Sequence, residues 1–238
     1  MHSPFVYNLS EEVFHKRSAE QADKIEAVRK ELRQDKTIIN LLDYGAGSRK
    51  TCDSKRSVAE IAKTSSTPIA MAQMMQRLIS FLDLKNVLEL GTNLGLTTAY
   101  LAAANPDSVV ISLEGDPSLA SLAVKNLQKI GLEAEIIEGR FEDNLDLALA
   151  KMVTVDFAYI DGNHRKEPTL NYFQSVLEKT TGNSVLAFGD IHWSEEMEEA
   201  WTAIKQNKSV TFTIDLFDIG LVFFRKDRAE VEHFTIRL

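Results

Sequence analysis

Cysteine, proline and long hydrophobic runs are scarce in this sequence, and each scarcity excludes a class of protein. The 238 residues include a single cysteine, Cys52, so no disulfide can form within the chain, and a reducing compartment suits it. Five prolines and 11 glycines are too few for a collagen-like or low-complexity chain. No apolar run approaches the roughly 20 residues of a membrane-spanning helix. We therefore expect a globular protein of the cytoplasm with no membrane partner.

Positive charge is also in deficit. Lysine and arginine number 27 against 35 aspartates and glutamates, which gives a formal net charge of -8. Nucleic-acid-binding proteins normally present a basic surface, so this balance argues against a nucleic-acid partner. Hydrophobic residues make up 44% of the chain, which is ordinary for a protein with a packed core. The length fits one domain with an extension.

The pattern of secondary structure changes near residue 84. Before that point the chain reads as helical, with Ser10 as a candidate N-cap and another helix start at Thr67 and Pro68. The opening residues 2–7 are too apolar for a free tail, so we expect them to pack. The sequence therefore predicts an N-terminal helical extension over residues 1–83 and a second unit over residues 84–238.

From residue 84 onward, apolar strands alternate with helices. The predicted strands are residues 86–90, 109–113, 134–137, 155–160 and 184–188, followed by 210–217 and 221–225. Strands separated by helices indicate a parallel sheet with helices on both faces. The last two are joined by a tight turn at residues 218–220, which indicates an antiparallel hairpin. The predicted fold class is α/β, a Rossmann-like doubly wound sheet of seven strands with the last strand antiparallel.

A glycine-containing loop joins the first of these strands to its helix, where the sequence reads ELGTNLGLTT from Glu89 to Thr98. Gly91 and Gly95 would let the backbone approach a ligand, and the next helix offers free N–H groups. Glu114 ends the second strand, where a carboxylate can accept both hydroxyls of a ribose. The pattern predicts a ligand that contains adenosine.

The same loop narrows the choice of ligand. Its glycine spacing differs from G-x-G-x-x-G and no Walker lysine follows, so dinucleotides and ATP are disfavoured. Glu89 would repel a pyrophosphate but suits the cationic amino group of a methionine moiety. These residues favour S-adenosylmethionine. The alternative is that Gly91 and Gly95 only form a tight turn and that Glu114 is solvated.

Residues 87–95 (VLELGTNLG) and 113–117 (LEGDP) resemble the class I S-adenosylmethionine-dependent methyltransferases, in particular the catechol and caffeoyl-CoA O-methyltransferase branch and its bacterial relatives. The resemblance covers about residues 70–226 and implies the same seven-stranded fold. The cofactor-binding residues that it implies are Glu89, Gly91, Thr92, Asn93 and Gly95 at the methionine end, Glu114 and Gly115 at the ribose, Gly139, Arg140 and Phe141 at the adenine, and Asp161 facing the donor.

The end of the fourth strand carries the candidate catalytic residues, in the segment YIDGNH that ends at His164. Methyl transfer requires that an oxygen be aligned with the methyl carbon and that its proton be removed. His164 is a candidate base because imidazole exchanges protons near neutral pH. Asp161 can face the donor or bind a divalent metal. In the resembling family, this aspartate and the one matching Asp190 bind magnesium, and the position of His164 carries a basic catalytic residue.

The resemblance fails directly after Asp190. The family has an acidic or amide ligand there, whereas this chain has Ile191, His192 and Trp193. Magnesium prefers oxygen, while a histidine suits manganese or zinc. A divalent metal, magnesium or manganese, on Asp161 and Asp190 is therefore an open expectation. In the alternative interpretations, Asp161 caps a helix and His164 is an exposed loop residue. Trp193 fits a substrate wall and the core equally.

A second glycine-rich loop, LDYGAGS, includes Tyr44–Ser48. No apolar strand that ends in an acid follows it, so we reject it as the donor site. Two roles stay open. The loop could cover the active site, with Arg49, Lys50, Lys55 and Arg56 meeting an anionic substrate, or it could be a solvated surface loop.

The sequence as a whole predicts an enzyme, an S-adenosylmethionine-dependent methyltransferase that acts on an oxygen of a small-molecule acceptor. His164 and Asp161 are the predicted catalytic residues. The alternatives are N- or C-methylation on the same fold, or a non-catalytic module that binds adenosylmethionine. The segment from Asp161 to His164 lacks the Pro-Pro-Tyr pattern that would favour a nitrogen acceptor. A homodimer is the prior expectation for a soluble enzyme.

Overall fold

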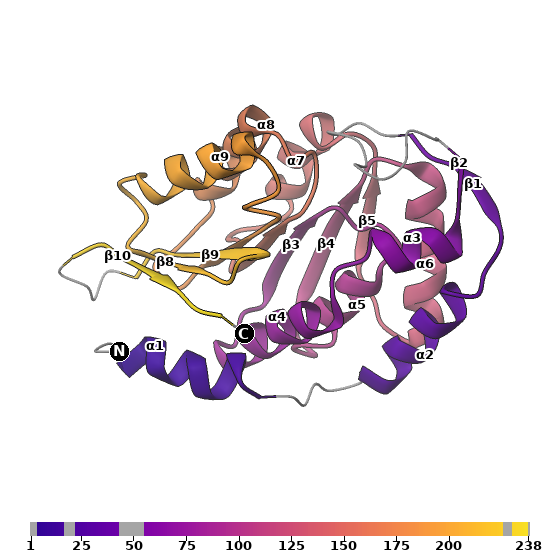
Figure 1. Cartoon of the computed structure of the whole chain (residues 1–238), viewed down its shortest axis with the longest axis horizontal. Helices are drawn as coiled ribbons and strands as arrows, with labels where there is room; N and C mark the ends of the chain where they lie inside the picture. Colours follow the sequence, from indigo (N-terminus) through magenta and orange to yellow (C-terminus); the bar gives the residue numbers. More distant parts are fainter. Residues whose placement is uncertain (1–3, 17–21, 43–54, 226–229, 238) are drawn as a thin grey trace.

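The computed structural model describes residues 4–16, 22–42, 55–225 and 230–237, and an eight-stranded sheet lies at its centre (Figure 1). The strand order is β10-β8-β9-β7-β6-β3-β4-β5. The strands are β3 (Asn86–Leu90), β4 (Val109–Glu114), β5 (Glu135–Glu138), β6 (Phe157–Ile160), β7 (Val185–Gly189), β8 (Phe212–Asp215), β9 (Ile219–Phe223) and β10 (Glu232–Thr235). The neighbours from β5 to β7 are parallel, and β9 is antiparallel to both β7 and β8. The predicted α/β fold and its antiparallel seventh strand are confirmed.

Two details of the sheet differ from the sequence prediction. β10 pairs in parallel with β8 as an eighth strand that the sequence did not indicate. The hairpin turns at residues 216–218 rather than 218–220, and Gly220 lies inside β9. A Cβ on Gly220 would lie 2.7 Å from the Trp201 ring, so this glycine provides room for the tryptophan rather than a turn.

Helices cover both faces of the sheet. Figure 1 shows α7 (Phe141–Ala150), α8 (Lys166–Leu177) and α9 (Glu195–Lys205) together on one face. The opposite face carries α1 (Pro4–Leu9), α4 (Ile69–Phe81), α5 (Leu96–Ala102) and α6 (Pro117–Ile130). Successive strand residues alternate between these layers. Val87 packs in the core with α1 and α4, and Leu88 packs in the core with α7 and α8.

The N-terminal segment is part of this packing. Val6 and Leu9 are fully buried in the core that includes α4, so the apolar opening packs as expected. The helix begins at Pro4 and continues into a π-helical turn, Ser10–Phe14, so the prediction of Ser10 as an N-cap was wrong. Residues 2–3 of the opening lie outside the described part of the chain.

The next elements lead toward the carboxyl edge of the sheet. α2 (Ala22–Leu32) and α3 (Val58–Thr64) pack outside α5 and α6, and two short strands, β1 (Ile38–Asn40) and β2 (Lys55–Ser57), pair antiparallel. The glycine-rich loop Tyr44–Ser48, with Arg49 and Lys50, lies outside the described residues. None of the helices described here combines the length and the apolar character that crossing a bilayer requires.

Candidate active site

A cavity of about 630 Å³ opens at the carboxyl ends of β3, β4, β6 and β7. β3 lies between β4 and β6, so the chain leaves β3 toward one side of the sheet and later returns on the other. Such a switch point leaves a crevice between the connecting loops, which is where open α/β sheets bind ligands. Described residues of the N-terminal segment, among them Leu41, Arg56, Lys63 and Met71, form a further part of the wall.

The glycine loop passes close to β6. Gly91 has φ +108°, and a Cβ there would lie 2.2 Å from the backbone oxygen of Asp161, so only glycine fits. Asn93 has φ +51° and donates a side-chain hydrogen bond of 2.5 Å to the Ser65 carbonyl. Gly91, Thr92 and Asn93 line the cavity. Gly95 does not line it, and its missing side chain instead allows close contact with Ala123 of α6.

Glu114 lies on the cavity wall at the end of β4, beside Gly115. Its side chain is nearly buried, and its two oxygens accept backbone N–H groups from Asn93 at 2.7 Å and Asp116 at 2.9 Å. Burial raises the pKa of Glu114 despite these bonds. The Gly115 backbone also bonds this carboxylate, and because each carboxylate oxygen has two lone pairs, acceptor capacity remains for a ligand hydroxyl.

Glu89 lies behind the glycine loop rather than on the cavity wall. Its side chain is fully buried, and Oε2 accepts hydrogen bonds from Thr98 at 2.5 Å and Ser112 at 2.6 Å. Thr92 in turn bonds Ser112 at 2.5 Å. Oε1 has no hydrogen-bond partner among the described residues. Desolvation raises the pKa of Glu89 to about 7. Glu89 therefore stabilises the glycine loop from the protein interior through Ser112 and Thr98. It is not on the cavity wall, so a direct contact with the methionine end of the donor stays a prediction.

The far end of the cavity is formed by the start of α7. Arg140 and Phe141 line it, as does Gly162, whose Cβ would meet the Phe141 ring at 2.6 Å. The predicted Gly139 has φ +126° at the turn before this helix and is not on the cavity wall. The Phe141 ring packs edge-on against Tyr172 at 5.8 Å. Tyr172 was not foreseen, because its position within α8 reads only as an apolar helix face.

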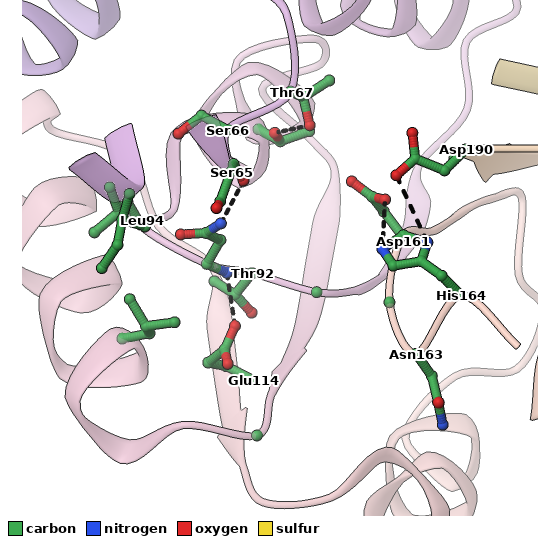
Figure 2. Close-up of a pocket in the computed structure, with 18 of the residues that line it drawn as sticks. Ser65, Ser66, Thr67, Thr92, Leu94, Glu114, Asp161, Asn163, His164 and Asp190 are labelled. Atoms are coloured by element: carbon green, nitrogen blue, oxygen red, sulfur yellow. Dashed lines mark hydrogen bonds and ion pairs between the residues drawn. The ribbon is translucent and has the colours of Figure 1, made fainter. Parts of the chain in front are cut away.

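The candidate catalytic residues His164 and Asp161 and the candidate metal ligand Asp190 converge at one side of the cavity. His164 Nε2 lies 3.9 Å from Asp161 Oδ1, and Nδ1 lies 3.7 Å from Asp190 Oδ2 (Figure 2). Suitable ligand atoms of the three residues lie within 4.8 Å of one another. His164 and Asp190 both have positive φ, +41° and +55°. Such backbone strain is common where a fold holds functional side chains in place.

His192 is turned away from this cluster. Its ring bonds Asp215 at 2.9 Å and Glu198 at 3.4 Å, and it does not line the cavity. His164, rather than His192, therefore supplies the imidazole beside the two aspartates. The Trp193 ring lies 6.2 Å from the His164 ring on the cavity wall. Trp201 is buried in the core.

The basic residues near the second glycine-rich loop are only partly described. Arg56 is buried and donates to Glu60, Thr64 and Ser65, so its guanidinium is engaged within the protein although it borders the cavity. Lys55 is exposed. Lys63, which the sequence did not single out, lines the cavity.

Comparisons with known proteins agree with this geometry. A family model described as a methyltransferase domain matches residues 88–191. The catechol O-methyltransferase of Niastella koreensis is 29% identical over 161 residues, which cover 66% of this chain and 72% of that protein. An O-methyltransferase of Aspergillus flavus is 34% identical over 101 residues, 40% of each chain. The solved O-methyltransferase from Bacillus cereus, in complex with SAH, has a TM-score of 0.63 at 18% identity and covers 92% of this chain and 97% of its own. At that identity the likeness establishes the fold alone.

The matched domain contains the strand-end residues of the candidate site, although the N-terminal part of the cavity wall lies outside it. It runs from Leu88 in β3 to Ile191 after β7, and so includes the glycine loop, the end of β4 and the aspartates on either side of His164. These are also the segments whose sequence resembled one methyltransferase branch. Residues 88–191 thus form a methyltransferase domain, and the chain is similar to the O-methyltransferases named above.

Proposed function

We propose that this protein transfers the methyl group of S-adenosylmethionine to a hydroxyl oxygen of a small-molecule acceptor, with His164 as the base. The observation that carries the proposal is the position of His164 between Asp161 and Asp190, on the cavity wall and next to the glycine loop. An enzyme that methylates a hydroxyl needs a proton acceptor at the point where the donor ends. The curated relatives are named as O-methyltransferases, which supports oxygen over nitrogen or carbon.

The cavity residues fit the donor in their chemistry. Gly91 lets the loop pack against the Asp161 backbone at the cavity wall, and Glu114 keeps acceptor capacity for ribose hydroxyls. Arg140 and Phe141 border the end that would hold adenine. The donor supplies the methyl group and a neutral thioether as leaving group. We therefore assign ribose binding to Glu114 and methionine binding to the loop from Gly91 to Asn93.

The protein's own contribution to the reaction is alignment and proton removal. His164 would take the proton from the acceptor hydroxyl, and the two neighbouring carboxylates would stabilise the imidazolium that forms. Trp193 would present a flat apolar wall to the acceptor beside His164. The residues from Lys63 to Met71 would close the cavity against water. Holding the reactants in line can itself supply several kcal/mol of the rate enhancement.

The donor set for a metal consists of two carboxylates and one imidazole, Asp161, Asp190 and His164. Ile191, at the position where the resembling family has an oxygen ligand, is buried in the core. Such a set suits manganese or zinc better than magnesium. A metal here would order the acceptor oxygen, but it would occupy the nitrogen that the proposed base needs. We therefore favour catalysis by His164 without a metal.

This assignment predicts that metal removal changes little. Enzyme treated with EDTA and then dialysed should keep its kcat within twofold, because proton removal depends on the imidazole alone. Methyl transfer measured with added magnesium, manganese or zinc should not exceed the metal-free rate, and zinc should inhibit by binding His164. Loss of activity with EDTA and its recovery with one of these ions would contradict the assignment.

A second prediction concerns the ribose. The substitution Glu114→Gln should weaken binding of S-adenosylhomocysteine about 30-fold, because hydrogen bonds to a charged group are worth about 1.5–3 kcal/mol. Isothermal titration calorimetry measures this directly. The matched control is Glu138→Gln, since Glu138 pairs with Glu114 on the neighbouring strand but is exposed. Equal affinity in both variants would remove Glu114 from the binding site.

The division of the chain, its assembly and its location remain proposals. Cavity-lining residues from Leu41 to Met71 support a covering role for residues 1–83 over a catalytic domain of residues 84–238. A homodimer is expected on general grounds, and sedimentation velocity would test it. The composition favours the cytoplasm.

A further inference from the structure

A chain of three hydroxyl groups ends on Asp161. Tyr159, in β6, is nearly fully buried, and its hydroxyl lies 2.8 Å from Asp161 Oδ2. Thr67 Oγ1, just before α4, lies 3.4 Å from the same hydroxyl. Thr97, in the first turn of α5, lies 2.9 Å from Thr67 Oγ1. Three separate segments of the polypeptide therefore meet at one carboxylate on the cavity wall.

The direction of these bonds follows from counting protons. An ionised carboxylate only accepts, so the single proton of Tyr159 is donated to Asp161. The tyrosine oxygen can then only accept from Thr67, whose own oxygen accepts from Thr97. The hydroxyl protons of Thr97, Thr67 and Tyr159 are therefore each donated in the direction of Asp161. Such an aligned row holds its terminal acceptor better than an isolated bond does, since the bonds polarise one another.

The other sides of Asp161 are held by backbone. Its N–H donates to the Leu90 carbonyl at 2.9 Å. A Cβ on Gly91 would lie 2.2 Å from its carbonyl oxygen, and a Cβ on Gly189 would lie 2.5 Å from Oδ1. The two glycines thus allow a close fit on both flanks. Rotation of the carboxylate is limited chiefly by the Tyr159 hydroxyl, because carboxylate torsions are otherwise broad.

We propose that Tyr159 is a positioning residue, which with Thr67 and Thr97 holds Oδ2 of Asp161 so that Oδ1 faces His164. The proposal rests on the proposed function, in which Asp161 stabilises the imidazolium of His164. It also gives the N-terminal segment a defined role, because Thr67 belongs to that segment and contacts the catalytic strand directly. Displacement of this segment would loosen Asp161 without any change in the catalytic residues themselves.

The test compares four variants. Tyr159→Phe removes the last hydroxyl and should lower kcat about tenfold, while the KM for the methyl donor stays within twofold. Thr67→Val should lower kcat about threefold, and Thr67→Ser, which keeps the hydroxyl, should recover it. The matched control is Tyr100→Phe, because Tyr100 is also buried and bonds a carboxylate, Glu26 at 2.9 Å, but lies outside the cavity. This control should lose thermal stability and keep kcat.

A crystal structure of Tyr159→Phe with S-adenosylhomocysteine gives a readout that does not depend on activity. We expect the Asp161 carboxylate to be rotated or spread over two orientations, whereas Tyr100→Phe should show the native one. An unchanged carboxylate, or a kcat within twofold of the wild type, would overturn the proposal. If the wild type bound S-adenosylhomocysteine but methylated no acceptor, the proposed function would fail. The orientation of the Asp161 carboxylate in the Tyr159→Phe crystal structure would then still decide whether Tyr159 is a positioning residue.

Discussion

Replacing His164 by glutamine should lower kcat about a thousandfold and leave the affinity for S-adenosylhomocysteine within threefold. General base catalysis contributes roughly 10²–10⁴ to a rate, and glutamine has no site that takes up a proton at neutral pH. The affinity should persist because the donor contacts assigned to Gly91 and Glu114, after β3 and at the end of β4, do not involve the His164 side chain. Steady-state methyl transfer and calorimetry measure the two quantities separately.

His192→Gln is the matched control for this prediction. His192 is an exposed histidine two residues after Asp190, but its ring bonds Asp215 and Glu198 and it is not on the cavity wall. We expect its kcat to stay within twofold of the wild type. If His164→Gln retained more than a tenth of the wild-type kcat, a base other than His164 would have to be sought.

Glu89→Gln should change the pH dependence of stability more than any other carboxyl substitution in this site. Desolvation is the main cause that raises the pKa of Glu89 to about 7 from an ordinary value of 4.5, and Asp161 and Glu114 add to it. Between those two pH values the unfolded chain loses a proton that the folded protein retains. Stability therefore falls as pH rises from about 4.5 to 7, and above pH 7 the loss is complete at about 3 kcal/mol.

The glutamine variant carries no charge at any pH and escapes this loss. The difference in free energy of unfolding between Glu89→Gln and the wild type should therefore rise by about 2–3 kcal/mol from pH 5 to pH 8. Urea unfolding followed by tryptophan fluorescence measures it. The test is how this difference in free energy of unfolding changes with pH, not its value at any one pH. The glutamine amide can leave a buried hydrogen-bond donor unpaired, which lowers the stability of the variant by the same amount at every pH. For the control Glu138→Gln, whose side chain is exposed, the difference in free energy of unfolding from the wild type should not change with pH. A flat difference for Glu89 as well would mean that its carboxyl is ionised in the folded protein.

Much of the fold was predictable because it depends on local pattern. Strands buried on both faces read as continuous apolar runs, and the helices between them carry their own start signals. Asp116 caps α6 through a 2.9 Å bond from the Leu119 N–H, as expected for the Asp-Pro pair in the sequence. β10 was missed because Glu232, His233 and Thr235 leave it without an apolar face. The hairpin turn was misplaced because Gly220 serves packing against Trp201 rather than chain reversal.

The candidate site was predictable to the extent that it lies at strand ends. Gly91, Glu114 and Asp161 each follow a strand that the sequence indicated, and parallel strands bring their carboxyl ends to one edge. The burial of Glu89 behind the glycine loop was not foreseen, since a sequence does not say which way a strand residue faces, and its contact with the donor stays a prediction. Thr67 was noted only as a helix start.

The doubly wound α/β sheet and a site for an adenosine-containing ligand follow from the sequence, because periodicity, glycines at a strand end and an acid at the next strand end are local features. Methyl transfer entered through the resemblance of residues 87–95 and 113–117 to a known family. Only the tertiary structure decided that His164 rather than His192 joins Asp161 and Asp190, and that Thr67 reaches Tyr159. Those contacts join residues far apart in the chain, and they depend on side-chain directions that packing alone sets.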